Sequence, residues 1–145
     1  MADLMSYLEV EPKREFICKL PYDSDLLLAL KDLAKKLNVK TAVFTLLGGL
    51  KNASLFYYIQ SEKRYVKITF DFPVEIVSGI GNIAMLNEEI MVHAHLVLSD
   101  REGRCYGGHL TEGSKVFACE VHLKEISPVL NRKYDPITGL NLLDI

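Results

Sequence analysis

The sequence has few cysteines, no tryptophan and no excess of charge of either sign. Its three cysteines, Cys18, Cys105 and Cys119, form no CxxC pair, so we expect no disulfide framework and a reducing, cytoplasmic location. No apolar run approaches the ~18 residues of a membrane-spanning helix, and the N-terminal residues show no secretory signal. The 17 basic and 19 acidic side chains give a net charge of −2. This balance excludes the strongly basic composition typical of nucleic-acid-binding domains.

The chain contains no GxGxxG motif, no Walker loop, no HExxH motif and no EF-hand pattern. What it does contain is 145 residues of which 49% are apolar, enough for one domain, residues 1–145, with a hydrophobic core. We expect residues 1–14 to form an N-terminal extension. Residues 127–145, which include Pro128 and Pro136, should form an irregular C-terminal wrap.

Leucine spacing predicts one main helix, over residues 23–38. Asp23 or Ser24 is expected to cap its N-terminus, and Asn38 its C-terminus. One face of this helix carries leucines at the 3.6-residue period: Leu26, Leu30, Leu33 and Leu37. We therefore expect the helix to pack against a sheet rather than to bind a ligand.

The rest of the chain consists of short apolar or alternating runs separated by turn residues. Gly48-Gly49 is expected to end the first run. Together with the helix, these runs predict an α+β fold built on an antiparallel sheet, or partial barrel, of about seven strands. The expected strands are 41–47, 53–60, 64–70, 74–85, 90–98, 104–110 and 116–126.

Three of the four histidines fall close together in the sequence, at His93, His95 and His109. Within 90–98 the even positions are all apolar, so the strand period of two directs them to the core. His93 and His95 then share the opposite face, where two imidazoles separated by ~6.6 Å of backbone can converge on one ion.

The turn after this strand decides where His109 lies. If Leu98 pairs with Arg104, His93 lies directly across from His109. A shift of two residues places His95 there instead, and either register gathers all three histidines. Gly107 and Gly108 leave room beside the cluster because neither has a side chain.

Three imidazoles without a thiolate favour Zn²⁺, with Fe²⁺ or Ni²⁺ as alternatives. Three protein ligands also leave a coordination position open for water or a small ligand. Glu120 is a candidate for orienting an imidazole or for acting as a general base, because the expected core set of 116–126 (Phe117, Cys119, Val121 and Leu123) places it on the opposite face. A solvated strand glutamate explains Glu120 equally well.

The stretch from His93 to Leu123, HAHLVLSDREGRCYGGHLTEGSKVFACEVHL, resembles the signature of the plant and prokaryote conserved (PPC) domain. The matching features are the HxH strand, the SDxxG turn, GGHL and the pair Glu120-Val121. The upstream FTLLGGLKNASLFY and VEIVSGIGNI and the tail RKYDPITGLNLL also resemble that family.

The resemblance implies a PPC-like antiparallel sheet with one helix, assembled as a homotrimer. Plant members bind AT-rich DNA through an AT-hook, but this chain has no RGRP core. Some prokaryotic members hold a metal on histidines that correspond to His93, His95 and His109.

Two functions follow as expectations. The first is a trimeric metal-binding protein whose three-histidine site accepts a small ligand, with the question of catalysis open. The alternative is a DNA-associated regulator of transcription. A trimer in which the histidines merely fill a surface hollow is the third interpretation.

Overall fold

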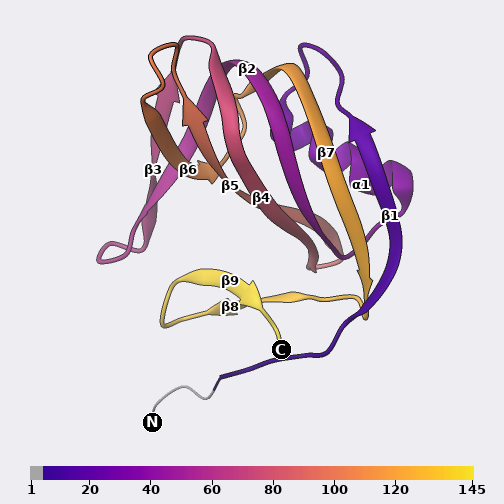
Figure 1. Cartoon of the computed structure of the whole chain (residues 1–145). Helices are drawn as coiled ribbons and strands as arrows, with labels where there is room; N and C mark the ends of the chain where they lie inside the picture. The colour runs from indigo at the N-terminus through magenta and orange to yellow at the C-terminus, as the bar shows by residue number, and fades with distance from the viewer. Residues whose placement is uncertain (1–4) are drawn as a thin grey trace.

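The computed structural model describes residues 5–145, which form one helix and nine strands (Figure 1). The elements in chain order are β1 (Glu11–Lys19), α1 (Leu26–Leu37), β2 (Ala42–Ile59), β3 (Arg64–Phe70), β4 (Val74–Leu86), β5 (Glu89–Ser99), β6 (Cys105–Leu110), β7 (Lys115–Ser127), β8 (Arg132–Asp135) and β9 (Leu140–Leu143). Within the described part of the chain, no helix is long and apolar enough to span a membrane.

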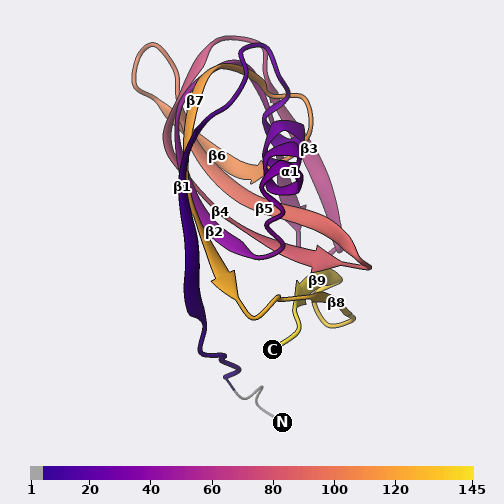
Figure 2. The ribbon, with the colours of Figure 1, turned by 90° about the vertical axis from the view of Figure 1, so that its right-hand side faces the viewer.

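Seven antiparallel strands form one curved sheet in the order β1-β7-β2-β4-β5-β6, and β3 pairs with β2 outside this path. The end of β2 also pairs with β6, through Leu55↔Leu110 and Phe56↔His109, so the sheet partly closes on itself. Figure 2 shows α1 lying against one side of the sheet, and the buried core lies between them. The predicted α+β fold with a seven-stranded antiparallel sheet and one helix is confirmed.

The helix starts later than the sequence predicted. Its N-cap is Asp25, whose carboxylate accepts a hydrogen bond from the Leu28 N–H at 3.1 Å, and neither Asp23 nor Ser24 takes this place. Asp23 has a φ of 65° and belongs to the preceding turn. Asn38 ends the helix in the left-handed conformation, as predicted. The fully or largely buried helix residues are Leu26, Ala29, Leu30 and Ala34.

The prediction that Gly48-Gly49 ends a strand is wrong, because β2 continues through both glycines. The pairing of β2 with β4 shifts register between Leu46 and Gly48, which makes this point a β-bulge rather than a turn. Gly48 has a φ of 143°, and a Cβ there would lie 2.0 Å from the carbonyl oxygen of Ala118 on β7. The glycine therefore allows two strands to approach closely.

Strand β1 was missed because its sequence carries no apolar alternation, and only Phe16 and Cys18 pack against the core. It is an edge strand, where Pro12 is tolerated since one side needs no donor. It begins at Glu11, within the stretch expected to be an N-terminal extension, and residues 1–4 of that stretch lie outside the described residues. The C-terminal residues expected as an irregular wrap contain the hairpin β8–β9.

One end of β7 also differs from the prediction. Phe117 is 61% exposed, whereas Val116 is fully buried. The register with β2 shifts here, since Gly49 pairs with Ala118 but Leu50 pairs with Val116. The rest of the predicted core set, which lies beyond the shift, is buried as expected: Cys119, Val121 and Leu123.

Candidate metal centre

Strand β5 presents two histidines on the sheet face opposite the core. The alternate apolar side chains of this strand are buried, as the period of two predicted: Val92, Ala94, Leu96 and Leu98. His93 is half-buried and His95 is exposed. Because the apolar side chains of β5 face the core, both imidazoles point to the opposite side of the sheet.

The β5–β6 register is the second of the two that the sequence left open. His95 pairs with His109, and Ser99 pairs with Cys105, so Leu98 does not pair with Arg104. The reason is the structure of the turn. The Asp100 N–H donates to the Arg104 carbonyl at 3.0 Å, so the turn closes at Asp100 and Arg104 rather than at Leu98 and Arg104.

Asp100 organises this turn through its carboxylate. It accepts hydrogen bonds from the backbone N–H groups of Glu102 and Arg104, from Arg104 Nε at 2.8 Å and from the Tyr106 hydroxyl at 3.0 Å. Burial alone would raise the pKa of Asp100, but these donors lower the pKa to about 2. A carboxylate held in this way fixes the register that brings His109 beside His95.

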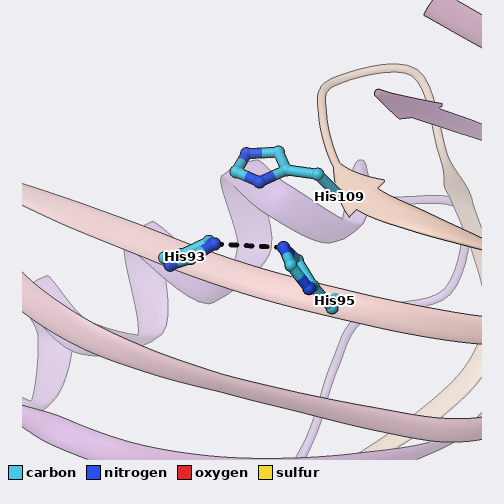
Figure 3. Close-up of side chains that lie close together, drawn as sticks. All are labelled: His93, His95 and His109. Atoms are coloured by element: carbon cyan, nitrogen blue, oxygen red, sulfur yellow. Dashed lines mark hydrogen bonds between the residues drawn. The ribbon is translucent and has the colours of Figure 1, made fainter. Parts of the chain in front are cut away.

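The three imidazoles converge on one point (Figure 3). His93 Nε2 and His95 Nε2 are 3.2 Å apart, and one ring nitrogen from each of the three histidines lies within 4.8 Å of the others. A tetrahedral zinc ion with bonds of ~2.0–2.1 Å needs ligand nitrogens ~3.3 Å apart. The cluster is therefore of the right size for a single ion, and its residues come from two adjacent strands.

The electrostatic environment favours neutral imidazoles. Burial lowers the pKa of His109 to about 4, with further lowering from His93, His95 and Arg132. The pKa of His93 is also lowered, first by burial and then by His95 and Arg132. A neutral imidazole has a free lone pair, which is the form that binds a metal.

Small residues and aromatic rings position His109. A Cβ at Gly108 would lie 2.9 Å from the carbonyl oxygen of Phe56, so glycine is needed where β6 pairs with the end of β2. The ring of Tyr65 lies 5.2 Å from the His109 ring, and that of Phe56 lies 6.4 Å away. These contacts limit the freedom of the His109 side chain.

A cavity of about 740 Å³ opens beside the histidines. Its lining comes from the three histidines, from the aromatic residues of β2 and β3, and from the β8–β9 hairpin, including Arg132. The sequence did not single out Arg132 or the aromatic wall. The tail RKYDPITGLNLL contributed only to the family resemblance, and no spacing rule could place it against a strand almost forty residues earlier.

The structure does not bring Glu120 to the histidines of the same chain. Glu120 pairs with Leu47 on β2 and Lys19 on β1, and two strands, β2 and β4, separate β7 from β5. The predicted role of Glu120 beside the histidines is not met within one chain, because β7 pairs with β2 rather than with β6. Glu120 is exposed and lines a separate hollow that also includes His122.

Acidification should destabilise the metal-free protein between pH 6.5 and about 4. In this range the unfolded chain takes up a proton on His109 that the folded chain does not, so stability is fully present above pH 6.5 and is lost as the pH falls. We expect a loss of about 1–2 kcal/mol, because solvent screens part of the difference. Urea unfolding at about pH 7 and pH 4.5 measures it. A His109→Asn variant should lose less, and an equal loss would contradict the account.

An antiparallel α+β sheet with three clustered histidines on its solvent-facing side defines a β-sheet domain with a candidate metal centre. The chain belongs to the Plants and Prokaryotes Conserved (PCC) domain family, which matches residues 7–127. The predicted family is therefore confirmed. A comparison with curated protein sequences finds no match.

Solved structures with the same fold include two proteins that are more than 30% identical to this chain. The metal-containing protein of Archaeoglobus fulgidus is 34% identical, with a TM-score of 0.90 over 96% of this chain and 99% of that one. A plant- and prokaryote-conserved protein of Pyrococcus horikoshii is 32% identical, with a TM-score of 0.90 over 97% and 98% of the two chains. A candidate DNA-binding protein of Bacteroides thetaiotaomicron is 24% identical, with a TM-score of 0.85 over 93% and 96%, and shows the shared fold alone.

Proposed function

We propose that this protein is a single-domain, cytoplasmic metal-binding protein in which His93, His95 and His109 hold one divalent ion. The convergence of three ring nitrogens within 4.8 Å of one another carries the proposal. The metal-containing relative from Archaeoglobus fulgidus supports it. Zn²⁺ suits three neutral imidazoles best, with Fe²⁺ or Ni²⁺ as alternatives. The free cysteines, Cys18, Cys105 and Cys119, fit a reducing location.

Three protein ligands leave one position of a tetrahedral ion for a small ligand, which the adjoining cavity can admit. When bound, the ion would supply Lewis acidity at that position. The protein's own contribution is to favour the neutral form of His93 and His109 and to fix the directions of the imidazoles through the β5 alternation and the Asp100 turn. We therefore assign the site to metal and ligand binding.

Elemental analysis of protein purified without added metal tests this proposal. We expect about one zinc, iron or nickel ion per chain, as a three-histidine site requires. The matched control is the variant with alanine at positions 93, 95 and 109, which should contain none. Metal-free native protein that also fails to bind added zinc would contradict the proposal.

We further propose that the chain forms a homotrimer, as its resemblance to the PPC family implies. An exposed apolar patch on the sheet face opposite α1 supports self-association, because patches of this kind mark interaction surfaces. Its members, which are 41–77% exposed, are Ile17, Leu47, Val77, Ile80 and Val97. We call this surface the outer apolar face.

The outer apolar face also gives Glu120 a place in the proposal. Thr45 pairs with both His122 and Ile80, and Ile80 pairs with His95. Glu120 lies two residues before His122 in β7, so its carboxylate and the histidines lie on the same side of the sheet. Packing of copies through this face is the arrangement in which a Glu120 carboxylate reaches a histidine cluster. There it would orient an imidazole or accept a proton.

Replacing Leu47 with glutamate should dissociate the trimer, because a buried unpaired carboxylate is strongly unfavourable in an apolar contact. Size-exclusion chromatography with light scattering should give three times the 16.4 kDa chain mass for the native protein and one chain mass for the variant. The control is Ile137→Glu, at an exposed apolar residue of the β8–β9 hairpin turn. A native protein of one chain mass would refute the trimer.

The alternative function, DNA binding, predicts a different result. With a net charge of −2 and an apolar outer face, we expect little phosphate affinity. A filter-binding assay at ~50 mM salt, where such affinity is strongest, decides between the two. Tight retention of duplex DNA would favour the regulator.

A further inference from the structure

A half-buried arginine shares the cavity with the three histidines. Arg132, at the start of β8, donates from Nη2 to Asn82 Oδ1 at 2.6 Å and from Nη1 to the Asn141 carbonyl at 3.0 Å. Asn82 pairs with His93 across β4 and β5, so the guanidinium is tied to the strand position opposite a candidate metal ligand. The arrangement holds a fixed positive charge beside the histidine cluster.

This charge has no counter-ion within residues 5–145. No carboxylate oxygen of that part of the chain lies within 4.0 Å of the Arg132 guanidinium, and both of its hydrogen-bond acceptors are neutral amides. Its Nε is buried without an acceptor. An unpaired charge that is withdrawn from water is costly. The half-buried guanidinium of Arg132 is therefore a candidate partner for an anion in the cavity.

The remainder of the cavity is suited to a flat apolar group. The rings of Phe56 and Tyr65 stack at 5.0 Å, and those of Tyr58 and Tyr65 lie 4.9 Å apart, so β2 and β3 present an aromatic wall. The Tyr58 hydroxyl donates to the Thr138 carbonyl at 2.6 Å, which fastens the β8–β9 hairpin over this wall. A volume of about 740 Å³ is typical of a small-molecule site.

We propose that the cavity binds a small aromatic carboxylic acid, whose carboxylate pairs with Arg132 and whose ring lies against the wall of Phe56, Tyr58 and Tyr65. This inference deepens the proposed function, on which it rests for the metal beside the ligand. Arginine suits this role because its planar guanidinium matches the two oxygens of a carboxylate. Because the three histidines line the same cavity, the bound acid would lie beside the proposed metal site.

Calorimetric titration with benzoate and with its neutral isostere benzamide tests the proposal. Both probes are added to metal-free and to zinc-loaded protein, because zinc alone can attract a carboxylate. In metal-free protein we expect benzoate to bind about tenfold or more tightly than benzamide, as a charge-assisted hydrogen bond provides. Equal affinities, or no binding of either probe to metal-free protein, would overturn the inference.

Two variants assign the preference to Arg132. Arg132→Gln should abolish it, whereas Arg132→Lys should retain part of it because the charge remains. The control Arg101→Gln removes an exposed charge of the β5–β6 turn and should bind benzoate as the native protein does. An Arg132→Gln variant that keeps the preference overturns the inference. If that variant does not fold, the comparison of the two probes on native protein decides alone.

The same experiment separates this inference from the proposed function. Benzoate preference in a protein that binds no zinc would leave the arginine site standing and refute the metal proposal. Zinc binding without a preference for benzoate in the metal-free form would leave the metal proposal standing and refute the arginine site.

Discussion

Replacing His95 with alanine is expected to lower zinc affinity by about 100-fold or more. Removing a group that only orients a metal ligand already costs ~10–100-fold, and His95 is proposed as a ligand itself. His95 is exposed and outside the core, so the metal-free variant should fold normally. Competition with a chromophoric zinc chelator measures the affinity, and circular dichroism checks the fold.

The matched control for this experiment is His122→Ala. His122 also points to the outer side of the sheet, but it contacts Glu15 and is not part of the cluster. Its removal should leave zinc affinity unchanged. If both alanine variants bind zinc equally well, the ion is held elsewhere and the proposed site is wrong.

Replacing Gly48 with alanine should destabilise the fold by about 3 kcal/mol or more, and it should reduce the yield of folded protein. The new Cβ would meet the Ala118 carbonyl oxygen at 2.0 Å, and the φ of 143° is one that side-chain-bearing residues rarely adopt. Two backbones would have to separate in the middle of the sheet. Chemical unfolding measures the loss.

Gly103→Ala separates the two causes. Gly103 also has a positive φ, 79°, but a Cβ there meets nothing within 4 Å. Only the backbone conformation is then penalised, at about 1–2 kcal/mol. Equal losses for the two variants would show that the close approach at Gly48 contributes nothing.

The sequence was most informative for elements whose periodic apolar residues pack against the core. In β5 the alternation of apolar residues directed His93 and His95 to the solvent-facing side, and the structure has this arrangement. Burial on one face forbids a slip by one residue, because such a slip would turn every side chain over. The leucine face of α1 was predictable because its leucines recur at the helical period and pack against the same core.

The details that failed depend on contacts distant in sequence. Gly48-Gly49 was expected to end a strand, since nothing nearby shows that β7 passes within contact distance of Gly48. A shift of two residues in the β5–β6 register leaves the core face unchanged, so alternation could not choose between the two registers. Asp100 and its hydrogen bonds decided between them.

The candidate site was predictable in part. Spacing and strand alternation gathered the three histidines, but they could not place Glu120, whose neighbours depend on β7 pairing with β2. Arg132 could not be predicted as a site residue, because it belongs to the β8–β9 hairpin and joins the cavity through its hydrogen bond to Asn82. A hydrogen bond between elements fifty residues apart leaves no periodic signal in the sequence.

The most direct test is a diffraction experiment at the zinc absorption edge on crystals of protein purified without added metal, with emission spectra to identify the element. We predict an anomalous peak between the ring nitrogens of His93, His95 and His109, at the ~2.0–2.1 Å typical of zinc–imidazole bonds. A peak at the same position that is identified as iron or nickel would mean that the site is correct and that the ion is not zinc. The account would be contradicted if no peak lay between the three imidazoles and their ring nitrogens were too far apart to bind a single ion.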